Sequence, residues 1–203
     1  MNYALAYRIG FHPWEGAAGQ AEFVERLSAL VAREEVSSPQ YGEALDLGTG
    51  SGIWATWLAE RGWRVTAVDH VEKAIERARA RVRDAGVNVR VVEGDVTELR
   101  SAGVGSGFRL FLDTGTFHGL DDGGRAAMAR EVTAIAAPDA TLLMIVWAPR
   151  RRGPFPRGSD RSELEAAFRG CEVTDEGPTG FRAPPPVALV LKPDEHWYRI
   201  RLN

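Results

Sequence analysis

The sequence predicts an α/β fold in which helices cover both faces of one mostly parallel, doubly wound sheet. Short apolar runs alternate with amphipathic stretches, which is the pattern of such a sheet. The chain has 203 residues, 44% hydrophobic and 26% charged, and chains of roughly 100 to 200 residues usually form one core. No internal repeat or second core is visible, so we expect a single domain over residues 1–203.

The first predicted element is an amphipathic helix at about 19–35, which Ser37, Ser38 and Pro39 end. Five strands then alternate with helices, which implies that the strands are parallel. The predicted strands are 44–47, 64–68, 88–92, 108–113 and 141–147. The predicted helices between them are 51–61, 71–85 and 123–137.

The pattern changes after Trp147. Residues 148–159 are rich in Pro, Gly and Arg, which predicts a loop over the sheet. A short helix is expected at 162–168, followed by extended segments at 172–176 and 196–202. The close spacing of these two segments is typical of an antiparallel pair, so the sheet should have seven strands.

The charge balance argues against a stable complex with nucleic acid or with an anionic membrane. The formal net charge is −3, whereas such partners are bound by a basic face. The arginine run 150–152, with Arg157 and Arg161, could form a basic rim for an anionic substrate or RNA. A solvated face is the favoured interpretation, so we expect a small-molecule partner.

Cysteine usage and hydropathy indicate the compartment. Cys171 is the single cysteine, whereas secreted domains that depend on disulfides carry several. Residues 1–16 lack the apolar core of a signal peptide, and the apolar run 142–148 is shorter than the roughly 20 residues of a membrane-spanning helix. We therefore expect a cytoplasmic protein; no metal site and no oligomeric state is predicted.

A glycine-rich turn carries the clearest functional signal. Gly48, Gly50 and Gly52 directly follow a predicted strand and precede a helix. Glycines allow close backbone approach to a ligand, and a helix N-terminus offers free N–H groups. Asp69 ends the next strand, where an acid can accept both ribose hydroxyls. The combination predicts a nucleoside-binding site.

Two ligand classes use this arrangement. A dinucleotide fingerprint could be drawn as Gly50-x-Gly52-x-x-Ala55, but the apolar run stops at Leu47 and the turn begins at Gly48. Asp46 would also be costly beside a pyrophosphate, whereas it suits a ligand that carries an ammonium and a sulfonium. S-adenosylmethionine is such a ligand.

Four motifs in the expected order resemble the class I S-adenosylmethionine-dependent methyltransferases. They are Leu45–Gly52, Val65–Asp69, Glu93–Val96 and Leu110–Asp113. The resemblance spans about 44–147 and implies a Rossmann-like seven-stranded sheet with an antiparallel C-terminal strand. It also implies S-adenosylmethionine as cofactor and S-adenosylhomocysteine as product.

The resemblance assigns roles to individual residues. Asp46 and the glycine turn would hold the methionine part, and Asp69 the ribose hydroxyls, with His70 beside it or pointing to solvent. Asp95 with Val96 would hold the adenine edge, although Asp95 could equally cap the turn at Thr97. Residues 113–116 would border the methyl group. The implied cofactor-binding residues are Asp46, Gly48, Thr49, Gly50, Gly52, Asp69, His70, Asp95, Val96, Asp113, Thr114 and Gly115.

The segment 11–15 is similar to the lid of bacterial small-molecule methyltransferases related to the thiopurine and tellurite-resistance enzymes. The domain is accordingly divided into an N-terminal helical lid (1–40), a cofactor-binding core (41–147), and a substrate loop with the C-terminal antiparallel strands (148–203).

The acceptor side is defined by fewer residues. An alcohol or ammonium nucleophile must lose a proton, which requires a base, whereas a thiol is partly ionised near neutrality. His118 is the candidate base because it follows Asp113 on the loop that should face the methyl group; lining the pocket is its alternative role. His12 is a weaker candidate, and Trp14 could contact the sulfonium or an aromatic substrate.

These observations predict a cytoplasmic enzyme that transfers a methyl group from S-adenosylmethionine to a sulfur, oxygen or nitrogen atom of a small molecule by in-line displacement. The alternatives are a methyltransferase acting on RNA or protein, a non-catalytic S-adenosylmethionine-binding protein, or a nicotinamide oxidoreductase. The sequence identifies neither the acceptor nor its reacting atom.

Overall fold

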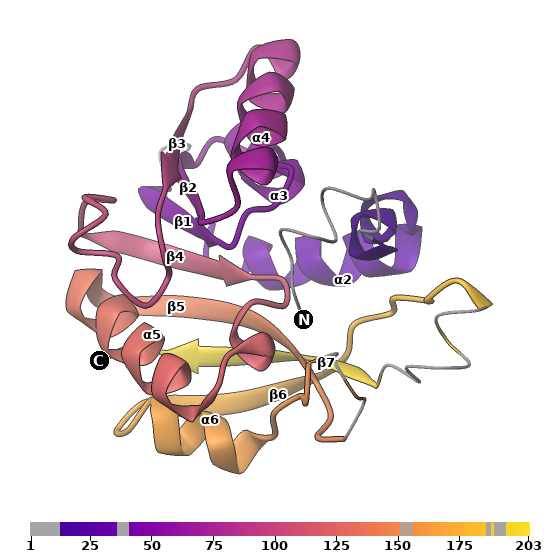
Figure 1. Ribbon diagram of the computed structural model, residues 1–203, viewed down its shortest axis with the longest axis vertical. Helices are drawn as coiled ribbons and strands as arrows, with labels where there is room; N and C mark the ends of the chain where they lie inside the picture. Colours follow the sequence, from indigo (N-terminus) through magenta and orange to yellow (C-terminus); the bar gives the residue numbers. More distant parts are fainter. Residues whose placement is uncertain (1–12, 36–40, 151–152, 154–155, 186–187, 189–193) are drawn as a thin grey trace.

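A seven-stranded sheet forms the centre of the computed structural model, which describes residues 13–35, 41–150, 153, 156–185, 188 and 194–203 (Figure 1). The strand order is β3-β2-β1-β4-β5-β7-β6. The strands are β1 (Glu43–Leu47), β2 (Arg64–Asp69), β3 (Val89–Glu93), β4 (Phe108–Asp113), β5 (Ala136–Trp147), β6 (Glu172–Pro178) and β7 (Glu195–Arg201).

The pairing of these strands confirms the predicted fold class. Strands β1 to β5 pair in parallel, and β7 pairs antiparallel with both β5 and β6. The helices are η1 (Pro13–Gly19), α2 (Ala21–Ala32), α3 (Ile53–Glu60), α4 (Glu72–Ala85), η2 (Phe117–Gly119), α5 (Asp122–Ile135) and α6 (Arg161–Ala167). In Figure 1, α3 and α4 lie by β1–β3, whereas α5 and α6 lie by β5 and β6.

The largest differences from the predicted boundaries lie in the first helix and in β5. The expected helix at 19–35 is replaced by η1 and the shorter helix α2. Strand β5 begins at Ala136 rather than at 141, because α5 ends at Ile135 and the next residues are extended. A proline at 138 disfavours helix for the residue before it, and Ala136 pairs with Phe108 before the register shifts.

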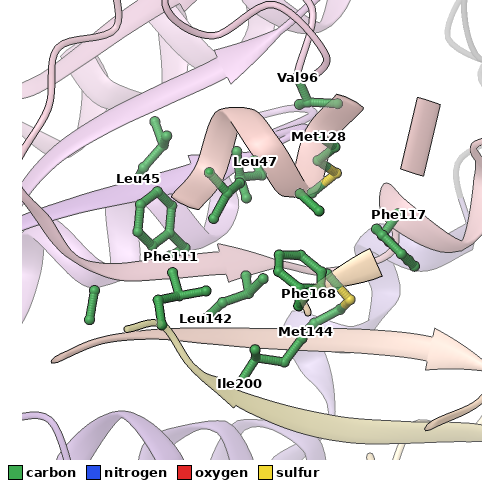
Figure 2. Packing of buried hydrophobic residues seen from close by; sticks show 14 of the residues in the cluster. Leu45, Leu47, Val96, Phe111, Phe117, Met128, Leu142, Met144, Phe168 and Ile200 are labelled. Atoms are coloured by element: carbon green, nitrogen blue, oxygen red, sulfur yellow. The ribbon is translucent and has the colours of Figure 1, made fainter. Parts of the chain in front are cut away.

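Side chains that alternate along the strands build a core on each face of the sheet. Figure 2 shows Leu45, Phe111, Leu142 and Ile200 side by side, with Met128 of α5 packed against the same cluster. Their strands are neighbours, since Leu45 pairs with Phe111, Phe111 with Leu142, and Leu142 with Ile200.

The opposite face is covered by α2 and α3. Phe23 of α2 and Trp54 of α3 pack there with Leu110 and Leu112, which flank Phe111 in β4 and point the other way. Phe23 also contacts Trp197 of β7, at a ring-centroid distance of 5.6 Å. The sheet is therefore doubly wound, as predicted.

The strand order predicts a ligand site at the C-terminal ends of the parallel strands. The chain runs from β1 outward to β2 and β3, then returns to the other side of β1 for β4 and β5. Ligands of open α/β sheets bind where the strand order reverses in this way, which here is the edge between β1 and β4. Within the described ranges, no helix has the length and apolar character needed to cross a membrane.

Candidate active site

Asp46 lies one residue before the end of β1 and is 1% exposed. Its Oδ2 accepts a hydrogen bond from Thr49 Oγ1 at 2.6 Å, whereas Oδ1 is buried and has no hydrogen-bond partner in the described part of the chain. Burial raises the pKa of Asp46 to about 7; the Thr49 bond and, more weakly, the backbone N–H of Ala55 oppose this, and the nearby carboxylates of Asp113 and Asp69 add to it. A cationic ligand would supply the missing partner.

The glycine turn joins β1 to α3. Gly48, Gly50 and Gly52 have φ values of 67°, 57° and 76°, a region that other residues rarely adopt. A Cβ on Gly48 would lie 2.0 Å from Thr116 Oγ1, and a Cβ on Gly52 would lie 3.0 Å from Ala78 Cα. Packing within the chain therefore requires glycine at 48 and 52, whether or not a ligand also approaches the turn.

Asp69 connects the glycine turn to the loop after β2. Its Oδ2 accepts the backbone N–H of Gly50 at 2.9 Å, and its Oδ1 accepts that of Val71 at 2.9 Å. The residue is 7% exposed, and each carboxylate oxygen can accept a second hydrogen bond. His70, the next residue, is exposed.

The end of β3 leads to the predicted adenine-binding pair. Asp95 is exposed, and its Oδ1 accepts bonds from the N–H and Oγ1 of Thr97 at 2.8 and 2.7 Å. Val96 is 6% exposed and packs in the core. The turn-capping alternative for Asp95 is therefore present, and a second role toward adenine stays a prediction.

Asp113 shapes the loop after β4. Its carboxylate is fully buried and accepts the backbone N–H groups of Gly115, Thr116 and Phe117 at 2.8, 2.6 and 2.9 Å. Burial raises the pKa of Asp113 to about 6, and these three bonds oppose the rise. The carboxylate holds residues 114–117 in place, with Thr114 and Gly115 half-buried.

His118 lies in η2, against the end of β5. The residue is 4% exposed, and its ring lies over the indole of Trp147 at a centroid distance of 5.1 Å. The backbone N–H of Trp147 donates to His118 Nδ1 at 3.3 Å. His118 follows β4, and its predicted role stays a prediction; the sequence gave no indication of the contact with Trp147.

Glu195, at the start of β7, extends this group of residues. Its Oε1 accepts a hydrogen bond from Trp147 Nε1 at 2.6 Å, and its Oε2 accepts one from Thr179 Oγ1 at 3.1 Å. Burial raises the pKa of Glu195 to about 7, against the effect of these two bonds. Sequence reasoning missed Glu195, because a lone glutamate at a strand end carries no pattern.

Arg125 of α5 supports the loops around His118. Its side chain is 4% exposed, and its Nη2 donates to the carbonyls of His118 and Gly158 at 3.1 and 2.6 Å. Its Nη1 donates to Glu163 at 3.0 Å. Burial, followed by the charge of Arg157, lowers the pKa of Arg125. The sequence gave no sign of this role, since arginines are usually solvated.

Two predicted residues lie outside what the structure describes. His12 precedes the described residues, and the side chain of Trp14 is also outside them, although Trp14 belongs to η1. Their predicted roles stay predictions. The neighbouring Glu15 pairs with Arg77 of α4 at 3.1 Å, so η1 contacts the helix that follows the Asp69 loop.

The residues at this edge fit S-adenosylmethionine. Asp46 Oδ1 and Ser51 Oγ are buried polar atoms that no described residue contacts by a hydrogen bond. A partner for the carboxylate must carry positive charge or N–H groups, and the ammonium of the cofactor does. Three carboxylates end β1, β2 and β4, which favours a cation and disfavours a pyrophosphate.

Comparison with known proteins agrees with this class of site. Residues 44–139 match the family described as "Methyltransferase domain". A ubiquinone biosynthesis O-methyltransferase of Rickettsia felis is 41% identical over 97 residues, which are 44% of this chain and 40% of that protein. The chain therefore matches less than half the length of this relative.

Solved structures show the same fold. The 1,6-didemethyltoxoflavin-N1-methyltransferase of Burkholderia thailandensis, with bound 1,6-didemethyltoxoflavin and S-adenosylhomocysteine, has a TM-score of 0.70 at 23% identity, over 100% of this chain and 86% of that one. A TehB-like methyltransferase from Corynebacterium glutamicum has a TM-score of 0.64 at 19% identity, over 90% and 88% of the two chains.

The reversed last strands and the glycine turn between acidic strand ends define a Rossmann-like methyltransferase fold. Residues 44–139 match a methyltransferase domain, and the sheet has the fold of the solved methyltransferases, which confirms the predicted fold class. These findings agree with the predicted family, enzyme class and cofactor.

Proposed function

We propose that this protein transfers the methyl group of S-adenosylmethionine to a nucleophilic sulfur, oxygen or nitrogen atom of a small molecule. The observation that carries the proposal is the buried, unpartnered Oδ1 of Asp46 beside the glycine turn. The bound cofactor would supply an electrophilic methyl group on a sulfonium. The chain would bind it, align the acceptor and exclude water, which favours loss of the sulfonium charge.

Each part of the cofactor has a proposed protein partner. Asp46 would bind the ammonium, and Asp69 the ribose hydroxyls, with His70 at the solvent side. Asp95 and Val96 would hold the adenine edge. The loop that begins at Asp113 would border the methyl group.

The acceptor would bind between the loop after β4, the end of β5 and the N-terminal segment. Trp14 and His118 are the proposed acceptor-side residues, and His12 is the weaker candidate there. Catalysis by His118 would follow either from base action or from orientation of the acceptor. Base action and orientation of the acceptor by His118 predict different effects on activity when His118 is replaced.

Charge pairing favours a small molecule over RNA. Arg157 contacts Glu163 at 2.5 Å and also pairs with Asp122, and Arg161 pairs with Glu165 at 2.7 Å. These arginines are therefore partly neutralised within the chain, and counterion release from RNA would be small. We propose that no stable nucleic-acid complex forms, and that the protein works in the reducing cytoplasm.

Calorimetry with S-adenosylhomocysteine, together with turnover of S-adenosylmethionine in pools of thiols, phenols and amines, tests the proposal. Asp69→Ala should abolish tight binding, while Asp84→Ala, an exposed aspartate in α4, should not change it. Asp69→Asn can keep only one of the two backbone hydrogen bonds, so thermal unfolding of both variants is needed to separate loss of ligand contact from loss of the turn. Unchanged affinity in Asp69→Ala would exclude the assignment, and salt-sensitive turnover of RNA would favour the alternative substrate.

A further inference from the structure

Glu195 lies past the end of β4, at the sheet edge that carries the proposed site. Because β7 runs antiparallel to β5, its first residue pairs with Trp147, the last residue of β5. Asp113 at the end of β4 pairs with Met144, three residues before Trp147, so Trp147 and Glu195 extend about 10 Å beyond that level. The pair therefore stands beside the loop after β4, which borders the proposed methyl site.

Glu195 and Asp46 lie on the same face of the sheet. Side chains alternate along a strand, and Trp197 of β7 and Ala44 of β1, each two residues from one of these acids, both belong to the core under α2 and α3. Strands β1 and β7 are separated by β4 and β5, which is roughly 14 Å across the sheet. Glu195 is thus on the cofactor face, at the distance of a small acceptor from Asp46.

Two neutral donors hold the carboxylate of Glu195, which is half-buried. Trp147 Nε1 donates to Oε1 at 2.6 Å, and Thr179 Oγ1 donates to Oε2 at 3.1 Å. Each oxygen has a second lone pair that can accept a proton. Burial raises the pKa of Glu195 to about 7, and the two bonds oppose the rise. A carboxylate that titrates near neutrality is suited to act as a base.

The donor Thr179 is itself fixed by the start of α2. Its backbone N–H donates to the Glu195 carbonyl at 2.9 Å. Three residues further on, the backbone N–H and carbonyl of Arg182 both pair with the side-chain amide of Gln20, at 2.7 and 3.0 Å. Segments from both ends of the chain therefore hold the carboxylate in one position, as a reacting group requires.

The charged groups around Glu195 leave burial as the main cause of its raised pKa. Those in the described part of the chain are His118 of η2, Asp194 and His196 beside it, Glu22 and Arg26 of α2, and Arg182 after β6. His196 pairs with Asp175 at 2.9 Å, and Glu22 pairs with Arg26 and Arg182 at 3.1 and 3.4 Å. Burial and the two neutral donors account for the shift.

We propose, on the basis of the function proposed above, that Glu195 is the base that removes a proton from the reacting atom of the acceptor. The substrate class follows from this role. It consists of small molecules that react through a hydroxyl, such as phenols, which hold their proton at neutral pH. Orientation of the acceptor is then the role that remains for His118.

The atoms and charges balance in this step. The carboxylate takes the hydroxyl proton, the freed oxygen pair bonds to the methyl carbon, and the carbon–sulfur bonding pair stays on sulfur as a neutral thioether. The negative charge of the carboxylate and the positive charge of the sulfonium both disappear. The proton on Glu195 then leaves to solvent.

Two acceptors compared in one variant separate base action from positioning. Glu195→Gln keeps an acceptor for the Trp147 N–H and cannot take a proton. We expect kcat/KM to fall about 10²- to 10⁴-fold for phenols, but to stay within about fivefold for aryl thiols that are already ionised. An equal loss for both acceptors would show that Glu195 only shapes the site and would overturn the proposal, as would undiminished turnover of phenols.

The pH profile with a phenol assigns the titrating group. In the wild type kcat/KM should rise with pH through about 7. Thr179→Val removes a donor that stabilises the carboxylate, so this rise should move up by about half a pH unit to one unit. Thr179→Ser keeps the hydroxyl and should retain the wild-type profile. A rise that persists in Glu195→Gln belongs to another group and would overturn the proposal.

The ionisation of Glu195 can also be measured without turnover. Carbon-13 NMR of the ligand-free protein, compared with Glu195→Gln, should show this carboxyl titrating near pH 7. Titration near pH 4 would overturn the base role. Calorimetry with S-adenosylhomocysteine should give the same affinity in wild type and Glu195→Gln. Failure of the wild type to bind would instead overturn the proposed function, and with it the base role, even if Glu195 titrates near pH 7.

Discussion

Burial of the Asp46 carboxylate with one oxygen unpaired costs free energy, and a bound cationic ligand can offset this cost. One oxygen is bonded to Thr49 and the other has no described partner, in a site where burial raises the pKa to about 7. A charge in such a site is costly unless it is paired. Below pH 7 the free protein therefore holds a proton there that a bound ammonium should displace.

The affinity for S-adenosylhomocysteine should depend on pH through Asp46. Binding lowers the pKa of Asp46, so below pH 7 it should release a proton and tighten by up to about tenfold for each pH unit gained. Above about pH 8, loss of the ligand's own ammonium proton should weaken binding again. Calorimetry in buffers of different ionisation enthalpy measures both the affinity and the proton release.

Asp46→Asn is the matched variant, because its amide oxygen can still accept the Thr49 bond. It should bind more weakly at pH 7 and lose the rise in affinity between pH 5.5 and 7. Asp84→Asn serves as the control on an exposed face and should retain the wild-type curve. A wild-type affinity that stays constant over this range would contradict the assignment of Asp46.

At the scale of single elements, Arg125 connects η2, seven residues before it, to the segment 158–163, which begins 33 residues after it. It holds the carbonyl of His118 in η2, the carbonyl of Gly158 before α6, and the carboxylate of Glu163 within α6. Gly158 is itself tightly packed, since a Cβ there would lie 2.4 Å from the Trp147 carbonyl. The guanidinium thus fixes the position of η2 against the loop after β5.

Replacing Arg125 should destabilise the fold strongly. Arg125→Met would leave the carbonyls of His118, Gly158 and Leu120 without this donor and Glu163 with Arg157 alone, at an expected cost of about 3–5 kcal/mol in the free energy of unfolding. Arg157→Met removes the more exposed partner of the same glutamate and should cost about 1 kcal/mol or less. Urea unfolding measures both, and similar losses in the two variants would refute the special role of Arg125.

The difference between local sequence patterns and contacts with distant residues explains which features could be predicted from the sequence. Strands β1, β2 and β4 are mainly apolar and carry an acidic residue at or next to their last position, so their position and the acids at one edge follow from local pattern. The early start of β5 was missed because residues 136–140 have no apolar run and pair through Phe108. The burial of Arg125 depends on Gly158, far along the chain, and no local pattern encodes it.

At the scale of the whole molecule, the fold buries three carboxyl groups whose protonated form is favoured over the ionised form by burial. Burial raises the pKa values of Asp46 and Glu195 to about 7 and that of Asp113 to about 6. Hydrogen bonds from Arg100 lower the pKa of Glu131, and the bond from Ser162 lowers that of Asp160. The acids with raised pKa values and those with lowered pKa values therefore affect the stability of the fold in different pH ranges.

The sign of the pH dependence follows from proton binding. In the unfolded chain Asp46, Asp113 and Glu195 lose their protons near pH 4, whereas in the native state they keep them to about 6 or 7. Between these values the native state binds more protons, so its stability falls as the pH rises. The contributions of Glu131 and Asp160 are lost only as the pH falls below about 4, which places maximum stability near pH 4.

Urea unfolding of the ligand-free protein should therefore show a lower free energy of unfolding at pH 8 than at pH 5. One pKa unit corresponds to about 1.4 kcal/mol, so the three raised values should together lower stability by at least ~2 kcal/mol. The double variant Asp46→Asn with Glu195→Gln mimics the protonated acids. The asparagine oxygen at 46 can keep the Thr49 donor and the glutamine oxygen at 195 the Trp147 donor, while the amide NH2 at 195 faces the Thr179 hydroxyl, which can accept. Its stability should change much less between the two pH values, because only Asp113 of the three still titrates. A wild-type protein that is more stable at pH 8 would show that these carboxylates are not held at raised pKa values, and would remove the electrostatic argument for a cationic ligand at Asp46.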